Sequence, residues 1–362
     1  MYYGRQQLAA EDSRLVQAYD YLGQQVNDMV DNVVMYRYFL TTNEFEKVLR
    51  YYHDDHPEVY WLNLSYSYNY VDMADPEKGT IRYIYAMQQE YSYTAADVAA
   101  NKVLIEERAQ ELLCGITDEM PSAERVRLVH DRLILSASYD TTYEAPHTHD
   151  LMGVMLEKTG VCESYARAFQ YLMYRCGINT ILQVGQLKGS TEHHMWNVID
   201  LDGEWYQIDT TWNDPVFSTP NPNYIRYNYY NVTDAQIGAE RAVYRVAAQI
   251  SKDGYLISYP YPSCTATAEN YYVKYAVDVD SFRTQIIAEE IARSILANDE
   301  AVFRPTGSYT VSKLDSDLKT YFQSLMIRVN ALLPADKQLV TPGYFFTPVD
   351  AHGVLAVHIR NY

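Results

Sequence analysis

A single helix with a cysteine at its first residue most constrains how this chain folds. Gly160 and Val161 precede Cys162, and apolar residues then recur at three- and four-residue spacing as far as Gly177. This period predicts a helix with one buried face, and Gly177 suits the position just after a helix end. The apolar face consists of Tyr165, Ala166, Phe169, Leu172, Met173 and Cys176. A lone cysteine at a helix start is usually a small buried residue, so the segments that follow decide its meaning.

Three runs of alternating apolar and polar residues follow this helix, at 180–187, 195–201 and 205–209. The Asp202-Gly203 pair predicts a tight hairpin turn between the last two runs. Pairing outward from that turn, Leu201 faces Glu204, and the numbers of paired residues sum to about 405. A helix followed by antiparallel strands predicts an α+β fold.

This register brings a carboxylate close to a histidine. Asp209 falls opposite Trp196, two residues from His194, and parity places His194 and Asp209 on one face within a one-residue shift. His193 faces the other side by strand alternation, so His194 is the better base. A thiol, an imidazole and a carboxylate are the parts of a cysteine-nucleophile site. We predict Cys162 as nucleophile, His194 as general base and acid, and Asp209 as the group that orients the imidazole.

Three sequence blocks resemble the transglutaminase-like superfamily, whose fold is papain-like. The blocks are Gly160-Val161-Cys162 with Tyr165-Ala166, then His194-Met195-Trp196-Asn197, then Asp209-Thr210-Thr211-Trp212. The resemblance covers about residues 120–235, and the segments 56–61 and 229–234 resemble bacterial members. One departure is Ser164, where many members have glycine. Serine is small, so we expect little consequence.

The resemblance implies that an amide gives a thioester acyl-enzyme, which water or an amine then resolves. Members of the superfamily include cross-linking enzymes, peptidases, deglycosylating amidases and proteins that have lost activity. No acidic calcium loop and no β-sandwich domain of the animal cross-linkers is visible. We therefore expect a thiol-dependent amidohydrolase, cysteine peptidase-like, acting on peptide or isopeptide bonds without a cofactor. The alternatives are a protein-glutamine transglutaminase and a non-catalytic module that binds peptide or glycan.

A loop over residues 136–150 is expected to border the substrate groove, because it runs into the segment just before Cys162. Its Tyr139, His147 and His149 can donate hydrogen bonds to a substrate backbone. Together with Tyr165, Trp196 and Trp212 from the three blocks, they are the predicted substrate-binding residues. A surface loop with incidental histidines is the alternative.

Net charge and tyrosine content limit the kinds of molecule that this protein is expected to bind. The net charge of −18 disfavours nucleic acid, whose phosphates require Lys and Arg, and favours a peptide or protein substrate of basic character. The 37 tyrosines, against 9 phenylalanines, either line a binding groove or occupy half-buried strand positions. No apolar run approaches the ~20 residues of a membrane span.

The cysteines and the first residues bear on metal binding and location. The four cysteines form no CxxC pair, which argues against a thiolate zinc site, and Cys114 and Cys264 are free to pair in an oxidising compartment. No signal peptide is visible at the first residues. We nevertheless expect a secreted bacterial protein, extracellular or at the cell surface after signal removal, with the cytoplasm as the alternative. The oligomeric state is left open.

Further patterns divide the chain into three segments. Residues 1–93 read as a helical and strand extension, with helix over 11–53 and strands at 58–70 and 80–91 around a turn at 75–79. Residues 94–260 form the predicted transglutaminase-like core, whose last part, 214–262, reads as loop. Residues 261–362 read as an α+β appendage. Its expected elements are helices at 280–298 and 315–333 and strands at 301–311 and 354–359.

Overall fold

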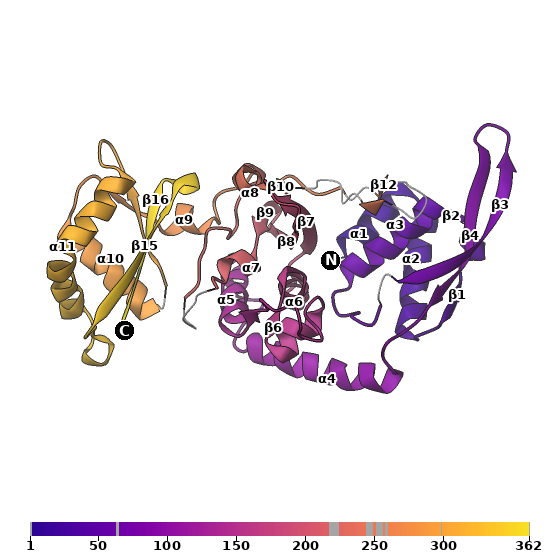
Figure 1. The fold of residues 1–362 in the computed structure, drawn as a ribbon, viewed down its shortest axis with the longest axis horizontal. Helices are drawn as coiled ribbons and strands as arrows, with labels where there is room; N and C mark the ends of the chain where they lie inside the picture. The colour runs from indigo at the N-terminus through magenta and orange to yellow at the C-terminus, as the bar shows by residue number, and fades with distance from the viewer. Residues whose placement is uncertain are drawn as a thin grey trace. The chain divides into compact units, whose positions relative to one another are not determined.

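The chain forms two compact units in a computed structural model, which describes residues 2–62, 65–216, 224–243, 249–250, 256–257, 260–297 and 299–361. Unit 1 contains Met1–Val216 and Thr233–Thr265, and unit 2 contains Phe217–Val232 and Ala266–Tyr362 (Figure 1). Each unit combines helices with sheets, so the α+β class predicted from the sequence is confirmed. The division into three segments at residues 93 and 260 stays a prediction.

Within the described residues, unit 1 holds most of the helices and four separate sheets. Its helices are α1 (Tyr3–Glu11), α2 (Ser13–Asn27), η1 (Tyr36–Tyr38), α3 (Thr42–Asp55), α4 (Ala95–Leu112), α5 (Ser122–Leu135), η2 (Gly153–Glu157), α6 (Cys162–Arg175), α7 (Thr210–Asn213) and α8 (Asp234–Glu240). Its strands are β1 (Asn32–Val34), β2 (Leu40–Thr41), β3 (Tyr66–Asp75), β4 (Gly79–Gln89), β5 (Ser138–Tyr139), β6 (Thr159–Gly160), β7 (Thr180–Leu187), β8 (His193–Leu201), β9 (Glu204–Ile208), β10 (Arg241–Val243), β11 (Gln249–Ile250) and β12 (Leu256–Ile257). None of the helices in the described part of the chain is both long and apolar enough to cross a membrane.

The sheet that carries the predicted site has the antiparallel order β10-β7-β8-β9. Leu201 pairs with Glu204 and Asn197 with Ile208, so the register predicted from the Asp202-Gly203 turn is confirmed. Both turn residues have positive φ, 57° at Asp202 and 93° at Gly203, which the tight hairpin requires. A local turn therefore fixes which residues of β8 and β9 face each other.

Helix α6 covers one face of this sheet (Figure 1). Its predicted apolar stripe is buried as expected, and Ala166 packs in a cluster with Leu182 of β7 and Met195 of β8. The Asn197 side-chain amide donates to the Ala166 carbonyl oxygen at 3.0 Å. Apolar contact and one buried hydrogen bond thus fix the helix against the strands.

The N-terminal helices cover the opposite face of the same sheet. Ile181 of β7 and Val198 of β8 belong to one buried cluster with residues of α1, α2 and α3. Helix α6 also reaches α3 directly, since Gln170 donates to the Asp54 carbonyl oxygen at 2.9 Å and Arg167 to that of His53 at 3.3 Å. The sheet is therefore buried on both faces, which explains the nearly continuous burial along β8.

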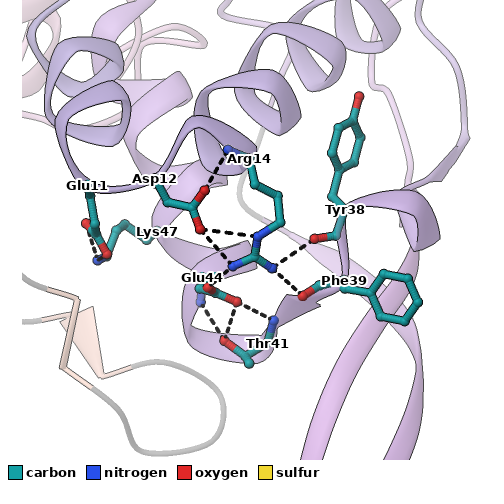
Figure 2. A network of polar contacts seen from close by, with 8 residues as sticks. All are labelled: Glu11, Asp12, Arg14, Tyr38, Phe39, Thr41, Glu44 and Lys47. Atoms are coloured by element: carbon teal, nitrogen blue, oxygen red, sulfur yellow. Dashed lines mark hydrogen bonds and ion pairs between the residues drawn. The ribbon is translucent and has the colours of Figure 1, made fainter.

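The predicted helix over 11–53 holds for α2 and α3 but is wrong between residues 28 and 41, where β1, η1 and β2 intervene. Figure 2 shows the polar contacts that join these pieces. Arg14 donates to the carbonyl oxygens of Tyr38 at 2.9 Å and Phe39 at 2.6 Å and pairs with Glu44. Glu44 in turn closes a capping box with Thr41 at the start of α3. Side chains thus satisfy the backbone where the helical run is interrupted.

The N-terminal strands form a hairpin of β3 and β4, which extends away from α1–α3 in Figure 1. The predicted turn is confirmed, since the Asp75 carboxylate accepts from the backbone of Glu77 and Lys78 and Gly79 has a φ of 80°. The first strand begins at Tyr66 rather than near residue 58. Residues 57–62 form turns instead, and Trp61 among them is buried, with its indole donating to the Val26 carbonyl oxygen at 3.1 Å.

Unit 2 is a small α+β unit. Its elements are α9 (Tyr271–Tyr275), β13 (Val277–Val279), α10 (Thr284–Ala297), β14 (Ala301–Pro305), α11 (Val311–Leu332), η3 (Ala335–Lys337), β15 (Pro342–Val349), η4 (Asp350–His352) and β16 (Val354–Asn361). Helices α10 and α11 pack on a sheet of order β13-β14-β16-β15. The predicted strand 301–311 ends early because a turn with positive φ at Gly307 leads into the Thr310 cap of α11. Strand β15 was not predicted, and Pro220 and Pro222 of the expected loop lie outside the described residues.

A buried carboxyl group lies inside unit 2. Glu300 is almost completely buried and accepts from the hydroxyls of Tyr224 at 3.2 Å and Tyr272 at 3.4 Å. Burial raises the pKa of Glu300 to about 8, against 4.5 for an ordinary glutamate. The folded unit therefore holds this proton more tightly than the unfolded chain does. The resulting contribution to stability is complete below about pH 4.5 and is lost as pH rises through 8.

We expect Glu300→Gln to remove this loss, because glutamine cannot ionise. At about pH 9 the free energy of unfolding of unit 2 should exceed that of the wild type by about 1–3 kcal/mol, and near pH 4.5 the two should agree. Hydrogen exchange of the β14 and β16 amides at both pH values measures the difference. The exposed Glu289→Gln is the matched control. An equal effect of Glu300→Gln at both pH values would contradict the prediction.

Candidate active site

Cys162 is the first residue of α6, as the sequence predicted, and is partly buried. Val161 precedes it in extended conformation, and no side chain caps this helix start. The departure at Ser164 has a clear structural consequence, since its hydroxyl accepts from the Val154 backbone at 2.9 Å and ties α6 to η2. Gly160 allows this close approach, because a Cβ there would lie 2.7 Å from the Ser164 hydroxyl oxygen. The thiol thus lies at a helix start whose N–H groups are not occupied by a capping side chain.

His194 and Asp209 are brought together by the β8–β9 hairpin. The His194 Nε2 atom lies 2.7 Å from an oxygen of Asp209, and both side chains are buried. The other Asp209 oxygen accepts from the Trp212 backbone N–H at 3.0 Å, which caps α7. His193 is exposed on the other side of the strand. The alternation argument therefore separates the two histidines as the sequence predicted.

His194 also lies close enough to Cys162 for the two groups to interact electrostatically. Since Asp209 occupies Nε2, the Nδ1 atom is the one left for the sulfur. Burial alone disfavours the imidazolium, but the charge and hydrogen bond of Asp209, with a further contribution from Cys162, outweigh it and raise the pKa of His194 to about 9. Burial also opposes ionisation of Asp209, yet Arg241 and then His194 hold the pKa of this carboxyl well below its usual range. The site therefore favours a charged imidazolium between two acidic groups.

Arg241 is the main residue of this site that the sequence analysis missed. It comes from β10, is fully buried, and its Nη1 donates to the same Asp209 oxygen that binds His194. Its guanidinium lies 5.1 Å from the ring centre of Trp196 and 5.0 Å from that of Trp212. One sequence pattern pointed to regular structure near Arg241. The Thr233-x-x-Gln236 capping box predicts the start of a short helix, and strand β10 with Arg241 follows that helix directly.

Trp196 and Trp212 lie around His194. The Trp196 ring stacks on the imidazole with centroids 5.7 Å apart, and Trp212 meets it edge-on at 6.1 Å. Trp196 is buried, and its indole donates to Gln207 at 2.6 Å. Its ring needs Gly185 of β7, where a Cβ would lie only 2.4 Å from the ring. Trp212 is 39% exposed, so of these two predicted substrate-binding residues it is the one that solvent reaches.

The predicted loop 136–150 docks on the segment just before Cys162. Strand β5 in this loop pairs with β6, placing Tyr139 beside Gly160, and Val161 donates to the Thr148 carbonyl oxygen at 2.9 Å. The buried Asp140 carboxylate organises the loop by accepting from residues that follow it, Thr142 and Thr148 among them. Burial, a hydrogen bond with Tyr143 and the charge of Cys162 raise the pKa of Tyr139. Tyr139 therefore lies near enough to Cys162 to interact with it electrostatically.

The two loop histidines pair with acids rather than with one another. His149 is largely exposed and its Nδ1 lies 3.7 Å from Glu163, the residue after Cys162. His147 lies 2.9 Å from Asp150 and also contacts the Tyr93 hydroxyl at 3.2 Å. His149 thus lies next to the helix start. His147 makes its contacts with Asp150 and Tyr93.

The carboxylate of Glu163, beside Cys162, is paired with neighbouring basic groups. Arg167 binds Glu163 at 2.9 Å from one turn further along α6. Burial alone raises the pKa of Glu163, but Arg167 and then His149 outweigh it and hold that pKa well below the usual range. Arg167 also contacts the partly buried His53 of α3. The N-terminal helices therefore help to position the residue next to Cys162.

Tyr165, the last of the predicted substrate-binding residues, lies inside the protein. Tyr165 is buried, and its hydroxyl donates to Asp214 at 2.6 Å. Cys114 and Cys264 are not joined by a disulfide; Cys114 is exposed, whereas Cys176 and Cys264 are buried. Among the described residues, no group of three or more His, Cys, Asp and Glu side chains is placed to hold a metal ion.

Residues 107–210 match the family model of the transglutaminase-like superfamily. This chain contains a transglutaminase-like domain. The match includes Cys162, His194 and Asp209, and the resemblance noted in the sequence is confirmed at the level of the family.

The transglutaminase-like domain is also similar to kyphoscoliosis peptidase of Mus musculus and of Homo sapiens, at 25% and 24% identity over 140 residues. Each match covers 34% of this chain and 21% of the relative, so the chain spans about a fifth of the length of these curated relatives. A solved structure of a TGase matches with 13% identity and a TM-score of 0.30, covering 43% of this chain and 47% of the other. A similarity that low supports no further argument.

Proposed function

We propose that unit 1 is a thiol-dependent amidohydrolase that cleaves peptide or isopeptide bonds through a thioester on Cys162. The observation that carries this proposal is the hydrogen bond of His194 with Asp209, together with the interaction of His194 with Cys162 at an uncapped helix start. A thiolate is the reactive form of cysteine, and an adjacent imidazolium and helix N-terminus both stabilise it. The arrangement has the parts of a cysteine, histidine and carboxylate triad.

The chemistry follows from the position of each group. The Cys162 thiolate attacks the substrate carbonyl carbon, and the negative charge that develops on its oxygen is stabilised by backbone N–H groups at the α6 start. His194 then gives its proton to the leaving amine, which breaks the amide bond and leaves a thioester. In the second half, His194 takes a proton from water, and the resulting hydroxide attacks the thioester. The carbon–sulfur bond then breaks, which releases the carboxylic acid product and returns Cys162 to its thiolate form.

Asp209 supports His194 through both halves of this cycle. Its hydrogen bond to Nε2 keeps Nδ1 directed to the sulfur, and its charge stabilises the imidazolium. Trp212 and Tyr139 flank the reacting groups and are proposed to contact the substrate. The relatives named kyphoscoliosis peptidase fit the choice of a peptide bond and of water as acyl acceptor.

The first prediction concerns thiol reactivity. Near pH 6, iodoacetamide should label Cys162 well before the other cysteines, because Cys162 lies at a helix start and interacts with His194. Cys114 is a built-in control, since it is exposed and free. Labelling followed by peptide mass mapping measures the order, and His194→Ala should slow labelling of Cys162 alone. Equal labelling of Cys162 and Cys114 in the folded protein speaks against the proposal.

The second prediction concerns the unequal roles of the three residues. Cys162→Ala and His194→Ala should lower turnover by roughly 10³–10⁶-fold, and Asp209→Asn by less than Cys162→Ala. Asp209 only orients and stabilises the imidazole, so part of the chemistry survives without it. Turnover of a peptide substrate measures the effects, with His193→Ala as the control because that histidine is exposed. Full activity of Asp209→Asn means that another carboxylate has this role.

The third prediction concerns the acyl acceptor. Incubation with a glutamine-containing peptide library, with and without a labelled primary amine, should give cleaved or deamidated peptides without amine incorporation. Mass spectrometry identifies the products, and Cys162→Ala should give none. Amine adducts that dominate over hydrolysis establish the transglutaminase instead. If no product forms although Cys162 reacts with iodoacetamide, the expected substrate class is wrong and a non-catalytic binding role gains support.

A further inference from the structure

We propose that Arg241 is a positioning residue whose charge sets the pH range over which Cys162 is reactive. This inference rests on the proposed function of Cys162. It concerns a residue outside the three sequence blocks, on strand β10 at the edge of the sheet.

The contacts of Arg241 leave its guanidinium little freedom. The side chain is 1% exposed and donates from Nη1 to the Asp209 oxygen, and its guanidinium lies 5.1 Å from the ring centre of Trp196 and 5.0 Å from that of Trp212. An arginine over aromatic faces gains cation–π attraction, which favours one placement of its guanidinium. Asp209 is itself completely buried, so it cannot obtain its countercharge from solvent.

These contacts place charges of alternating sign in a row. Arg241 is positive and Asp209 negative, and when Cys162 has given up its proton, His194 is positive and the thiolate negative. The four charges then sum to zero in a site that is mostly buried. Without Arg241, the same reactive state carries a net negative charge. Buried net charge is strongly disfavoured, so the protein should keep the Cys162 proton to a higher pH.

The other titratable groups that face this row do not supply the missing charge. Tyr139 of β5 interacts with Cys162 and Tyr143, and Glu192, just before β8, adds only negative charge near Tyr139. Glu163, next to Cys162, already pairs with Arg167 and His149. Arg241 is the only arginine or lysine that pairs with Asp209 among the described residues. Its removal therefore has a specific electrostatic consequence.

The test measures the rate of iodoacetamide labelling of Cys162 in the full-length protein against pH. In Arg241→Met the midpoint of the rate profile should move upward by about 1–3 pH units, since an opposite charge at this range shifts titrations by that amount. In Arg241→Lys the midpoint should stay close to the wild-type value, because lysine keeps the positive charge. Arg82→Met is the matched control, as it removes another arginine–aspartate pair, with Asp72, on the exposed hairpin.

A merely structural role gives a different result. If Arg241 only fills space, Arg241→Met lowers the labelling rate at every pH and leaves the midpoint in place, which overturns the inference. A midpoint in Arg241→Lys as high as in Arg241→Met overturns it as well. An upward shift in Arg241→Met alone, with a nearly wild-type midpoint in Arg241→Lys, supports it.

A second variant decides the case in which Arg241→Met does not fold. The double variant Asp209→Asn with Arg241→Met removes both charges of the buried pair. If the double variant folds where the single variant does not, the uncompensated Asp209 charge was the cause, as proposed. If neither folds, Arg241 acts through packing and the inference fails.

The wild-type profile separates this inference from the proposed function. A Cys162 that reacts no faster than Cys114 at any pH refutes the proposed function itself. A reactive Cys162 whose midpoint does not respond to Arg241→Met refutes only the role of Arg241.

Discussion

The buried carboxylate of Asp209 is the interaction on which the rest of the site depends. It is fully removed from solvent and accepts from His194, Arg241 and the Trp212 backbone. Each donor comes from a different element, β8, β10 and α7. A buried charge persists only when its oxygens are satisfied by paired donors. The position of the histidine, the start of α7 and the docking of β10 at the sheet edge therefore all converge on a single carboxylate.

The low solvent exposure of His194 and Asp209 comes from burial of the sheet on both faces. Helix α6 covers one face, and residues of α1–α3 share a core with Ile181 and Val198 on the other. The N-terminal helices reach further, because α3 provides the His53 and Asp54 contacts that hold Arg167 and Gln170 of α6. Charges interact more strongly away from water. The helices before residue 62 thus support the electrostatics around Cys162 although they contribute none of the reacting groups.

The match of residues 107–210 to the transglutaminase-like family model and the geometry of the site answer different questions. The family match locates a domain at residues 107–210, whereas Arg241 and the whole of β10 lie beyond it. The proposed chemistry uses a thiol and an imidazole at the edges of α6 and β8, and its acid–base balance depends on a residue outside the matched range. The reactivity of such a site is therefore a property of the complete unit 1 and not of the three sequence blocks alone.

The sequence by itself determined the parts of the site that depend on local pattern. The Asp202-Gly203 turn fixed the register of β8 and β9, strand alternation separated His194 from His193, and the helical period placed Cys162 at the start of α6. These features depend on residues a few positions apart, so periodicity and turn chemistry are sufficient to predict them. Only the tertiary structure decided that Arg241 binds Asp209, that Gly185 makes room for Trp196, and that α1–α3 close the second face of the sheet. Those contacts join segments distant in sequence, where no local period constrains the partner, and burial and charge compensation in the folded chain select it.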